Sequence, residues 1–295
     1  MSAVITPFEG TELFNTASFN NRISQINTGF SYVSNPNLLD NWYFGNPVNQ
    51  RGQTEYTGDW VYTIDRWQVS QNTTLTVNNG SVSSTGGYWY EPLEEIVDAL
   101  RGRTVTISLL FASGELEFAT GVVPTTWGSW DNIALSGHVV LKGIGEDSKR
   151  LWFMVNDIAE NILAAKLELG PTQTLAHREG DRWVLNEVPD YGEQLRRCQR
   201  YYLSNKQRNA YGKSVSANAA YVDIPTPVTM RALPAIKTGA IGNIICKGVK
   251  ATIKSINPVK LNDESITLHL VLNTSVSVDY PVFLTDTKYA LSADL

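Results

Sequence analysis

The sequence predicts an all-β protein with two β regions, preceded by a short N-terminal helix. After Pro36 the chain alternates short apolar and polar runs that are separated by Gly, Asn and Pro, a pattern typical of β-sandwiches. Thr104 to Phe111 is the clearest strand, because Val105, Ile107 and Leu109 share one face while the polar residues between them lie opposite. We expect that strand to be half buried.

The length and the changes in pattern predict the domain organisation. A chain of 295 residues exceeds the roughly 100 to 150 residues that usually share one hydrophobic core. We expect a helical attachment or oligomerisation segment over 1–33, a β-sandwich domain over 34–188, a helix and linker loop over 189–218, and a second β domain over 219–295.

Composition excludes several classes of function. The 29 acidic residues outnumber the 24 basic ones, so the net charge of -5 gives no reason to expect nucleic acid binding. No run approaches the roughly 18 apolar residues of a membrane span, and the first residues lack the features of a signal peptide. The only cysteines, Cys198 and Cys246, suggest neither a disulfide framework nor a thiolate metal site, and we expect no cofactor.

The N-terminal segment carries an apolar stripe. Phe19, Ile23, Ile26 and Phe30 are spaced four, three and four residues apart, which places them on one side of a helix. Such a short helix is marginal alone and needs a partner surface. Two alternatives stay open: the helix packs on its own β domain, or it associates with copies of itself at an attachment end, with a trimer favoured.

Two further helices are expected between the strands. Pro92 near a start and Gly102 just past an end bracket one short amphipathic helix. Asp190 and Glu193 form a capping-box pattern at the start of another.

The polar stretch from Ser204 to Asn218 indicates a long loop. Strand composition then returns over Lys250–Ile256, Ile266–Leu272 and Ser275–Val278, with turns at Asn257-Pro258 and Asn262-Asp263.

Several blocks carry a family resemblance when they are read in order. They are Asn37-Leu38-Leu39-Asp40-Asn41-Trp42, Asn46 to Gln53, Tyr62-Thr63-Ile64-Asp65-Arg66-Trp67, Ala165 to Gly170, Pro189 to Tyr202 and Ile224 to Arg231. This succession resembles phage and prophage tail-fibre or receptor-binding proteins, whose first domain is similar to the jelly roll of carbohydrate-binding modules. Fold alone does not decide function, so the site must be argued from its own residues.

The resemblance implies a virion protein, and three functions follow as alternatives. The first is a fibre or spike subunit, a homo-oligomer with a homotrimer favoured, that adheres to host-surface glycans and meets other virion proteins through its N-terminal segment. The second is a purely structural part, such as a capsid decoration, head fibre or tail adaptor, without a ligand. The third, less favoured, is a glycan depolymerase. We expect a binding protein rather than an enzyme.

Two aromatic clusters are the candidate glycan site. Sugars commonly stack on aromatic faces while nearby polar side chains bind their hydroxyls. The clusters combine rings with polar residues in expected loops: Tyr88, Trp89, Tyr90, Trp127, Trp130, Asp131 and Asn132. The alternative is that these rings fill the sandwich core. Four other tryptophans are expected in the core: Trp42, Trp67, Trp152 and Trp183. An ion pair between Asp65 and Arg66 is expected to have a structural role.

Catalytic and metal sites receive little support from the sequence. Glycan hydrolysis requires two carboxylates across a cleft, and the available acids are Glu91, Glu94, Glu95, Glu115, Glu117 and Asp131. Glu94 and Glu95 fit the solvated face of a helix, Glu115 and Glu117 fit the outer side of a strand, and carboxylates this common give almost no specificity. The three histidines are isolated: His138, His177 and His269. A structural Ca²⁺ is common in similar jelly rolls, and Asp40, Asn41 or Glu168 could supply oxygen ligands.

Overall fold

The structure is a computed structural model that describes residues 34–93, 96–126, 132–144, 150–156, 158–205, 210–240, 242–285 and 288–294. The expected N-terminal helix, with Phe19, Ile23, Ile26 and Phe30, lies outside these residues. The chain forms two compact units. Unit 1 comprises the residues up to Pro47 together with Gln53–Thr63 and Trp67–Pro189; unit 2 comprises Val48–Gly52, Ile64–Arg66 and Asp190–Leu295. Among the described residues, no helix has the length and apolar character of a membrane span.

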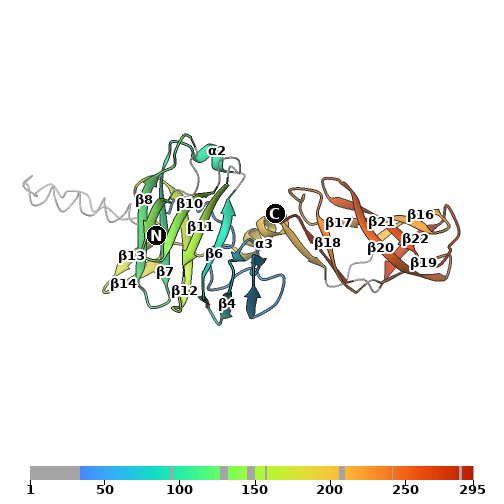
Figure 1. The fold of residues 1–295 in the computed structure, drawn as a ribbon, viewed down its shortest axis with the longest axis horizontal. Helices are drawn as coiled ribbons and strands as arrows, with labels where there is room; N and C mark the ends of the chain where they lie inside the picture. Colours follow the sequence, from blue (N-terminus) through green and yellow to red (C-terminus); the bar gives the residue numbers. More distant parts are fainter. Residues whose placement is uncertain are drawn as a thin grey trace, which may run out of the picture. The chain divides into compact units, whose positions relative to one another are not determined.

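Unit 1 is a β-sandwich of two six-stranded antiparallel sheets (Figure 1). Sheet A has the order β1 (Glu55–Gly58), β4 (Thr73–Asn78), β5 (Ser81–Thr85), β12 (Ile162–Leu169), β7 (Thr104–Phe111) and β8 (Leu116–Val122). Sheet B has the order β2 (Val61–Tyr62), β3 (Gln68–Val69), β6 (Tyr88–Leu93), β11 (Arg150–Asn156), β10 (Val139–Ile144) and β9 (Asn132–Ser136). A small hairpin, β13 (Ala176–Glu179) with β14 (Arg182–Leu185), follows.

Large aromatic rings fill the space between the two sheets. The Trp67 ring lies 4.5 Å from that of Trp89 and 6.0 Å from that of Phe153, measured between centroids. Phe44 packs edge-on against both tryptophans. All four side chains are fully buried. Trp42 is also buried, so the expected core positions of Trp42 and Trp67 are confirmed.

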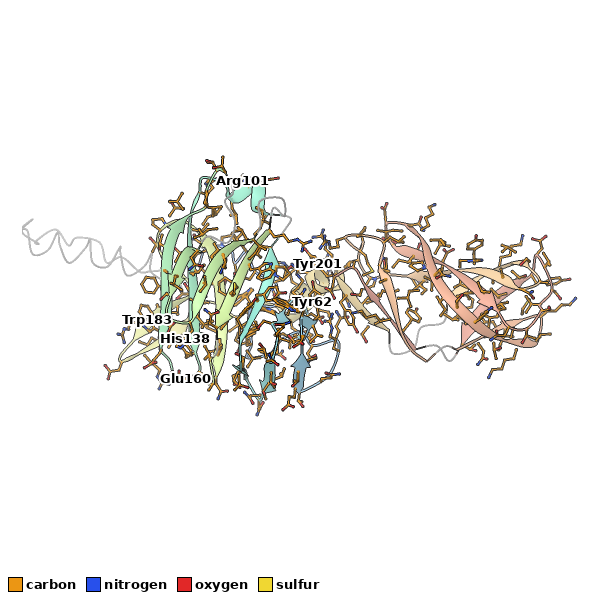
Figure 2. The ribbon with its side chains drawn as sticks, in the orientation of Figure 1. Tyr62, Arg101, His138, Glu160, Trp183 and Tyr201 are labelled. Carbon is orange, nitrogen blue, oxygen red and sulfur yellow. The ribbon has the colours of Figure 1, made fainter. Side chains whose placement is uncertain are left out.

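The hairpin of β13 and β14 carries Trp183, which was expected in the core. The side chain is only half buried, and the guanidinium of Arg178 lies 5.3 Å from the centre of its ring. Figure 2 labels Trp183 on this hairpin. The expected core position of Trp183 is therefore wrong, because the hairpin forms a two-stranded sheet of its own outside sheets A and B.

Strand β7 has the bounds that its alternation predicts, but it is buried on both faces. Thr106 and Ser108, which were expected to face solvent, are fully buried. The hydroxyl of Thr106 donates to the carbonyl of Gly170 at 2.7 Å, because the segment after β12 folds back over this face. Lys166 lies on the same sheet, fully buried, and donates to the Ser34 hydroxyl at 2.6 Å. The prediction of a half-buried strand is thus wrong, since a polar layer covers it.

The helix expected after Pro92 is shorter than its sequence pattern indicates. Helix α2 spans only Val97–Leu100, while Pro92 and Leu93 belong to strand β6. Proline fits there because the neighbouring strand β3 pairs only with Tyr90 and Trp89, so no ladder bond is needed at Pro92 on that side. Glu94 and Glu95 lie outside the described residues.

Unit 2 begins with helix α3 (Tyr191–Gln199). The backbone N–H of Glu193 donates to the Asp190 carboxylate at 2.8 Å, which confirms the predicted N-cap. A three-stranded sheet contains β15 (Tyr202–Asn205), β23 (Lys288–Ser292) and β18 (Ala235–Ala240). A closed barrel has the order β16 (Ala210–Ser216), β17 (Ala219–Pro225), β21 (Ser265–Leu272), β20 (Val249–Leu261), β19 (Asn243–Cys246) and β22 (Pro281–Thr285).

The loop expected over 204–218 is wrong, because β16 closes the barrel there. Its inward residues, Ala210 and Ser214, are fully buried but small, so the strand lacks the bulky apolar alternation that identifies other strands. The turn expected at Asn257-Pro258 is also wrong, since β20 runs through it with a local shift of register. Ser275–Val278 is not a strand. The turn at Asn262-Asp263 is confirmed.

A buried polar network lies within unit 2. Arg51 makes ion pairs with Asp65 at 3.0 Å and with Asp294 at 2.7 Å, and its guanidinium lies 3.8 Å from the centre of the Tyr202 ring. The Gln50 amide donates to Asp65 at 2.6 Å. Arg66, expected to pair with Asp65, stacks on another ring of unit 2. The structural role predicted for Asp65 thus includes a pairing with Arg51.

We expect this network to make unit 2 less stable as the pH rises. Burial raises the pKa of Asp65 to about 7, and it also raises the pKa of Asp294. The folded state therefore holds more protons than the unfolded state between about pH 4 and 7, and the free energy of unfolding falls across that window. Urea unfolding of unit 2 at about pH 5 and about pH 8 measures the effect.

The matched variant for this measurement is Asp65→Asn, which keeps an oxygen for the Gln50 amide but cannot titrate. Its stability should depend less on pH than that of the wild type. A wild-type protein that gains stability from pH 5 to pH 8, by an amount that Asp65→Asn abolishes, would contradict the prediction.

Candidate functional site

The outer face of sheet B gathers apolar and aromatic side chains away from the core. Residues that pair across an antiparallel sheet lie on the same face. Tyr90 pairs with Met154 on β11 and with Gln68 on β3. Continuing the pairing in both directions gives one row across all six strands: Leu135, Val140, Met154, Tyr90, Gln68 and Tyr62. Figure 2 labels Tyr62 at the β2 end of this row.

The neighbouring rows add rings and charge to the same face. Trp152 pairs with Pro92 on one side and with Lys142 on the other. Arg150 is two residues before Trp152 on β11 and therefore shares its face. On the opposite side of the first row, Tyr88 pairs with Asn156. The outer face thus carries a cluster of rings with two cations along one side.

Four rings pack together on this face. The rings of Tyr90 and Trp152 are stacked, with centroids 4.1 Å apart and planes inclined by 21°. Trp60, from the turn between β1 and β2, lies across them, 6.3 Å from Tyr90, 6.2 Å from Trp152 and 6.1 Å from Tyr88. We call Trp60, Tyr88, Tyr90 and Trp152 the aromatic face. It is separate from the core rings, which lie on the other side of the sheet.

Trp60 has a strained backbone although it is exposed. Its φ of 58° lies in the left-handed region, which costs a residue other than glycine about 1–2 kcal/mol. The side chain remains 46% exposed. The turn is held beside it, because Asp59 accepts a hydrogen bond from the backbone N–H of Asn72 at 3.0 Å. Strain of this kind is concentrated at functional sites, which suggests that the position of the ring has a function.

The polar groups of the aromatic face are fixed in place. The Tyr90 hydroxyl donates to the Gln68 side-chain oxygen at 2.6 Å. Burial raises the pKa of Tyr90 well above its usual value, the nearby Tyr62 and Tyr88 raise it further, and Arg150 lowers it. Burial also raises the pKa of Tyr88. Both phenols are therefore neutral hydrogen-bonding groups at physiological pH.

The structure divides the predicted glycan site. Tyr88 and Tyr90 belong to the aromatic face, whereas Trp89 between them points to the opposite side and is fully buried in the core. Its ring is not available to a ligand at the surface, so its assignment to the site is corrected. Trp127, Trp130 and Asp131 lie outside the described residues. Asn132 is exposed at the start of β9, opposite Lys142.

Two tryptophans of the aromatic face were not predicted. Trp152 was expected in the core, because the run from Leu151 to Val155 is apolar throughout and its alternation cannot be seen. It is only half buried and faces outward. Trp60 follows Gly58-Asp59, a turn signal that places a large ring at the surface. That signal was sufficient to identify Trp60 as a candidate.

Several of the carboxylates considered for catalysis or Ca²⁺ already have partners. Both oxygens of the buried Glu91 accept from the backbone N–H of Asp40, at 3.0 and 3.1 Å. Glu117 accepts from the backbone N–H of His138 at 2.8 Å, and both Glu168 oxygens accept from Thr174. Over the part of the chain that the structure describes, no three His, Cys, Asp or Glu side chains form a group that could hold a metal.

Comparison with known proteins gives no further indication of function. No protein-family model, no curated protein and no solved structure matches this chain. The resemblance to phage fibre proteins therefore stays a prediction from sequence, and function must follow from the chemistry of the aromatic face.

Proposed function

We propose that this chain is a glycan-binding subunit of a bacteriophage fibre or spike, and that the aromatic face is its binding surface. The observation that carries the proposal is that Trp60 and Trp152 are displayed on the outer face of sheet B, although the core is already filled by Trp67 and Trp89. Flat rings at a surface, bordered by amide and hydroxyl groups, suit the apolar faces and hydroxyls of sugars.

The architecture is compatible with this role. Two facing antiparallel sheets, in which β12 pairs with β5 and β7, and β11 pairs with β6, have the long connections expected of a jelly roll. Together with the sequence blocks described above, this supports the carbohydrate-binding-module-like domain.

The N-terminal segment would join the subunits, as a trimer, to other virion proteins. Several copies of one weak site would then give strong adhesion, because later binding steps become intramolecular.

Binding rather than hydrolysis is the proposed activity. The oxygens of Glu91 are directed to the backbone of Asp40 inside the sandwich, and Glu117, on strand β8 of sheet A, is bonded to His138. Neither carboxylate lies in the rows that carry the aromatic face. An adhesive surface needs the rings and their polar neighbours only.

We expect Trp60→Ala and Trp152→Ala to weaken glycan binding, and the double variant to weaken it by at least about 30-fold, the effect of losing a binding hot spot of about 2 kcal/mol. The measurement is retention on an array of bacterial surface polysaccharides, with affinities from titration of the glycans that bind. The control is Phe118→Ala, which removes a similarly exposed ring (49%) from strand β8 of sheet A.

Circular dichroism and the oligomeric state should be unchanged in all the variants. Either of two results would refute the proposed function. One is an assembled wild-type protein that retains no polysaccharide of the array. The other is a folded double variant that binds as tightly as the wild type, which would place any glycan site elsewhere and favour the structural alternative for this face.

A further inference from the structure

We infer that Gln68 and Tyr90 together recognise one sugar hydroxyl at the aromatic face, so that the bound glycan presents a free, unsubstituted hydroxyl beside its stacking surface. This inference rests on the proposed function and names the residues that determine its specificity. It follows from the position of Gln68, from its hydrogen bond to Tyr90, and from the donor and acceptor atoms that this bond leaves available.

Gln68 is the only amide in the row of six outer residues that crosses sheet B. Its neighbours along the chain, Trp67 and Val69, are fully buried in the core, so the alternation of the strand turns Gln68 to the outer face. There it lies between its cross-strand partners Tyr62 and Tyr90. Only 7% of Gln68 is exposed, so the side chain has little freedom left to lose when a ligand binds.

The hydrogen bond between the two residues fixes the direction of the amide. The Tyr90 hydroxyl donates to the side-chain oxygen of Gln68 at 2.6 Å. Because burial raises the pKa of Tyr90, the phenol keeps the proton that makes this bond. The Nε2 of Gln68 retains two N–H donors. Among the described residues it has no hydrogen-bond partner, and it is not one of the side-chain atoms sealed from solvent without a partner, so it reaches the surface.

Gln68 and Tyr90 therefore offer a donor and an acceptor side by side. Gln68 Nε2 can only donate, and Tyr90 Oη, whose proton is committed to Gln68, can only accept. Among the groups of a neutral sugar, only a hydroxyl accepts and donates through a single oxygen; a carbonyl or an ether oxygen only accepts. A hydroxyl that contacts both atoms would close a ring of three hydrogen bonds, in which each bond strengthens the next.

The same arrangement disfavours a ligand that lacks the hydroxyl proton. Water can bond to both atoms in the free protein, and a ligand that displaces this water loses affinity unless it replaces those bonds. A methyl ether cannot donate to Tyr90, and its methyl group adds bulk beside an amide that has little room to move. We expect the loss of one hydrogen bond of ordinary net strength to cost about tenfold in affinity.

The test compares a polysaccharide that the wild type retains on the array with the same polymer after O-methylation. Methylation replaces the hydroxyl protons and leaves the apolar faces of the sugar rings. We expect the wild type to bind the native polymer at least about tenfold more tightly than the methylated one, as measured by titration of both.

Variants assign this preference to the two side chains. Gln68→Met removes the donor and Tyr90→Phe removes the acceptor, and both changes nearly keep the size of the side chain. Each should weaken binding of the native polymer about tenfold and leave the methylated polymer within about twofold. The double variant should bind within about twofold of either single variant, because both changes act on the same hydroxyl. The matched control, Gln199→Met with Tyr211→Phe, changes the same residue types in unit 2 and should behave like the wild type.

The outcomes separate the two levels of the proposal. Equal binding of native and methylated polymer by the wild type, with both lost in the Trp60 and Trp152 double variant, would overturn recognition of a hydroxyl and keep glycan binding. A preference for the native polymer that survives in a folded Tyr90→Phe protein would overturn the role of Gln68 and Tyr90. So would variants that lose both polymers alike, since that pattern indicates a structural role only. Retention of no polymer at all would refute the proposed function itself.

Discussion

Trp89→Ala is expected to lower the free energy of unfolding of unit 1 by about 3–5 kcal/mol, the range for removing a fully buried large ring. The Trp89 side chain is completely inaccessible and contacts the rings of Phe44 and Trp67, at centroid distances of 5.1 and 4.5 Å. The truncation would leave a cavity lined by Phe44 and Trp67, which are themselves fully buried. The neighbouring Tyr88→Ala should have a much smaller effect on stability.

Two further variants, Trp89→Phe and Tyr88→Ala, test whether the loss of stability in Trp89→Ala comes from its buried position. Among the described residues, the buried indole N–H of Trp89 has no hydrogen-bond acceptor, so Trp89→Phe loses no bond there and should cost under about 2 kcal/mol. Tyr88→Ala should instead weaken glycan binding. Urea unfolding followed by tryptophan fluorescence reports unit 1, because all eight tryptophans belong to it. Equal destabilisation by Trp89→Ala and Tyr88→Ala would contradict the assignment of the two residues to opposite faces.

Arg51→Met is expected to destabilise unit 2 by about 3–5 kcal/mol at pH 8, because it leaves two buried carboxylates without their shared cation. Asp65 and Asp294 both pair with Arg51. The Ser292 hydroxyl donates to the Asp294 carboxylate at 3.1 Å, but it brings no charge to replace the guanidinium. The loss should become smaller toward pH 5, since protonation neutralises the two carboxylates that have lost Arg51.

Unit 2 contains no tryptophan, so its unfolding is followed by the near-ultraviolet circular dichroism of its tyrosines. The control Arg182→Met removes an exposed arginine of unit 1 and should leave this transition unchanged. Adding Asp65→Asn and Asp294→Asn to Arg51→Met should recover much of the lost stability, because the two carboxylates can no longer ionise. A loss for Arg51→Met that is the same at pH 5 and pH 8 would show that charge is not its cause.

Local patterns in the sequence were sufficient to predict many elements. The alternation of Thr104 to Phe111 predicted the bounds of β7. The capping box at Asp190 located the start of α3. These features depend on residues within one turn or strand, so the sequence shows them directly.

Elements with small or uniformly apolar residues could not be predicted in the same way. Strand β16 faces the barrel interior with Ala210 and Ser214, which resemble loop residues until the closed barrel surrounds them. In β11 every residue from Leu151 to Val155 is apolar, so nothing local shows which of them leave the core. The covering of β7 by the chain after β12 is a contact between distant segments.

By itself, the sequence determined that the chain is β-rich, where several strands, turns and the capped helix lie, and that Tyr88 and Tyr90 belong to a candidate site. Only the tertiary structure decided that Trp89 faces the core, and that Trp60 and Trp152 join the two tyrosines on the outer face of sheet B. The physical reason is that the alternation of a strand defines two faces, but which face is buried depends on the strands and segments that pack against it from elsewhere in the chain.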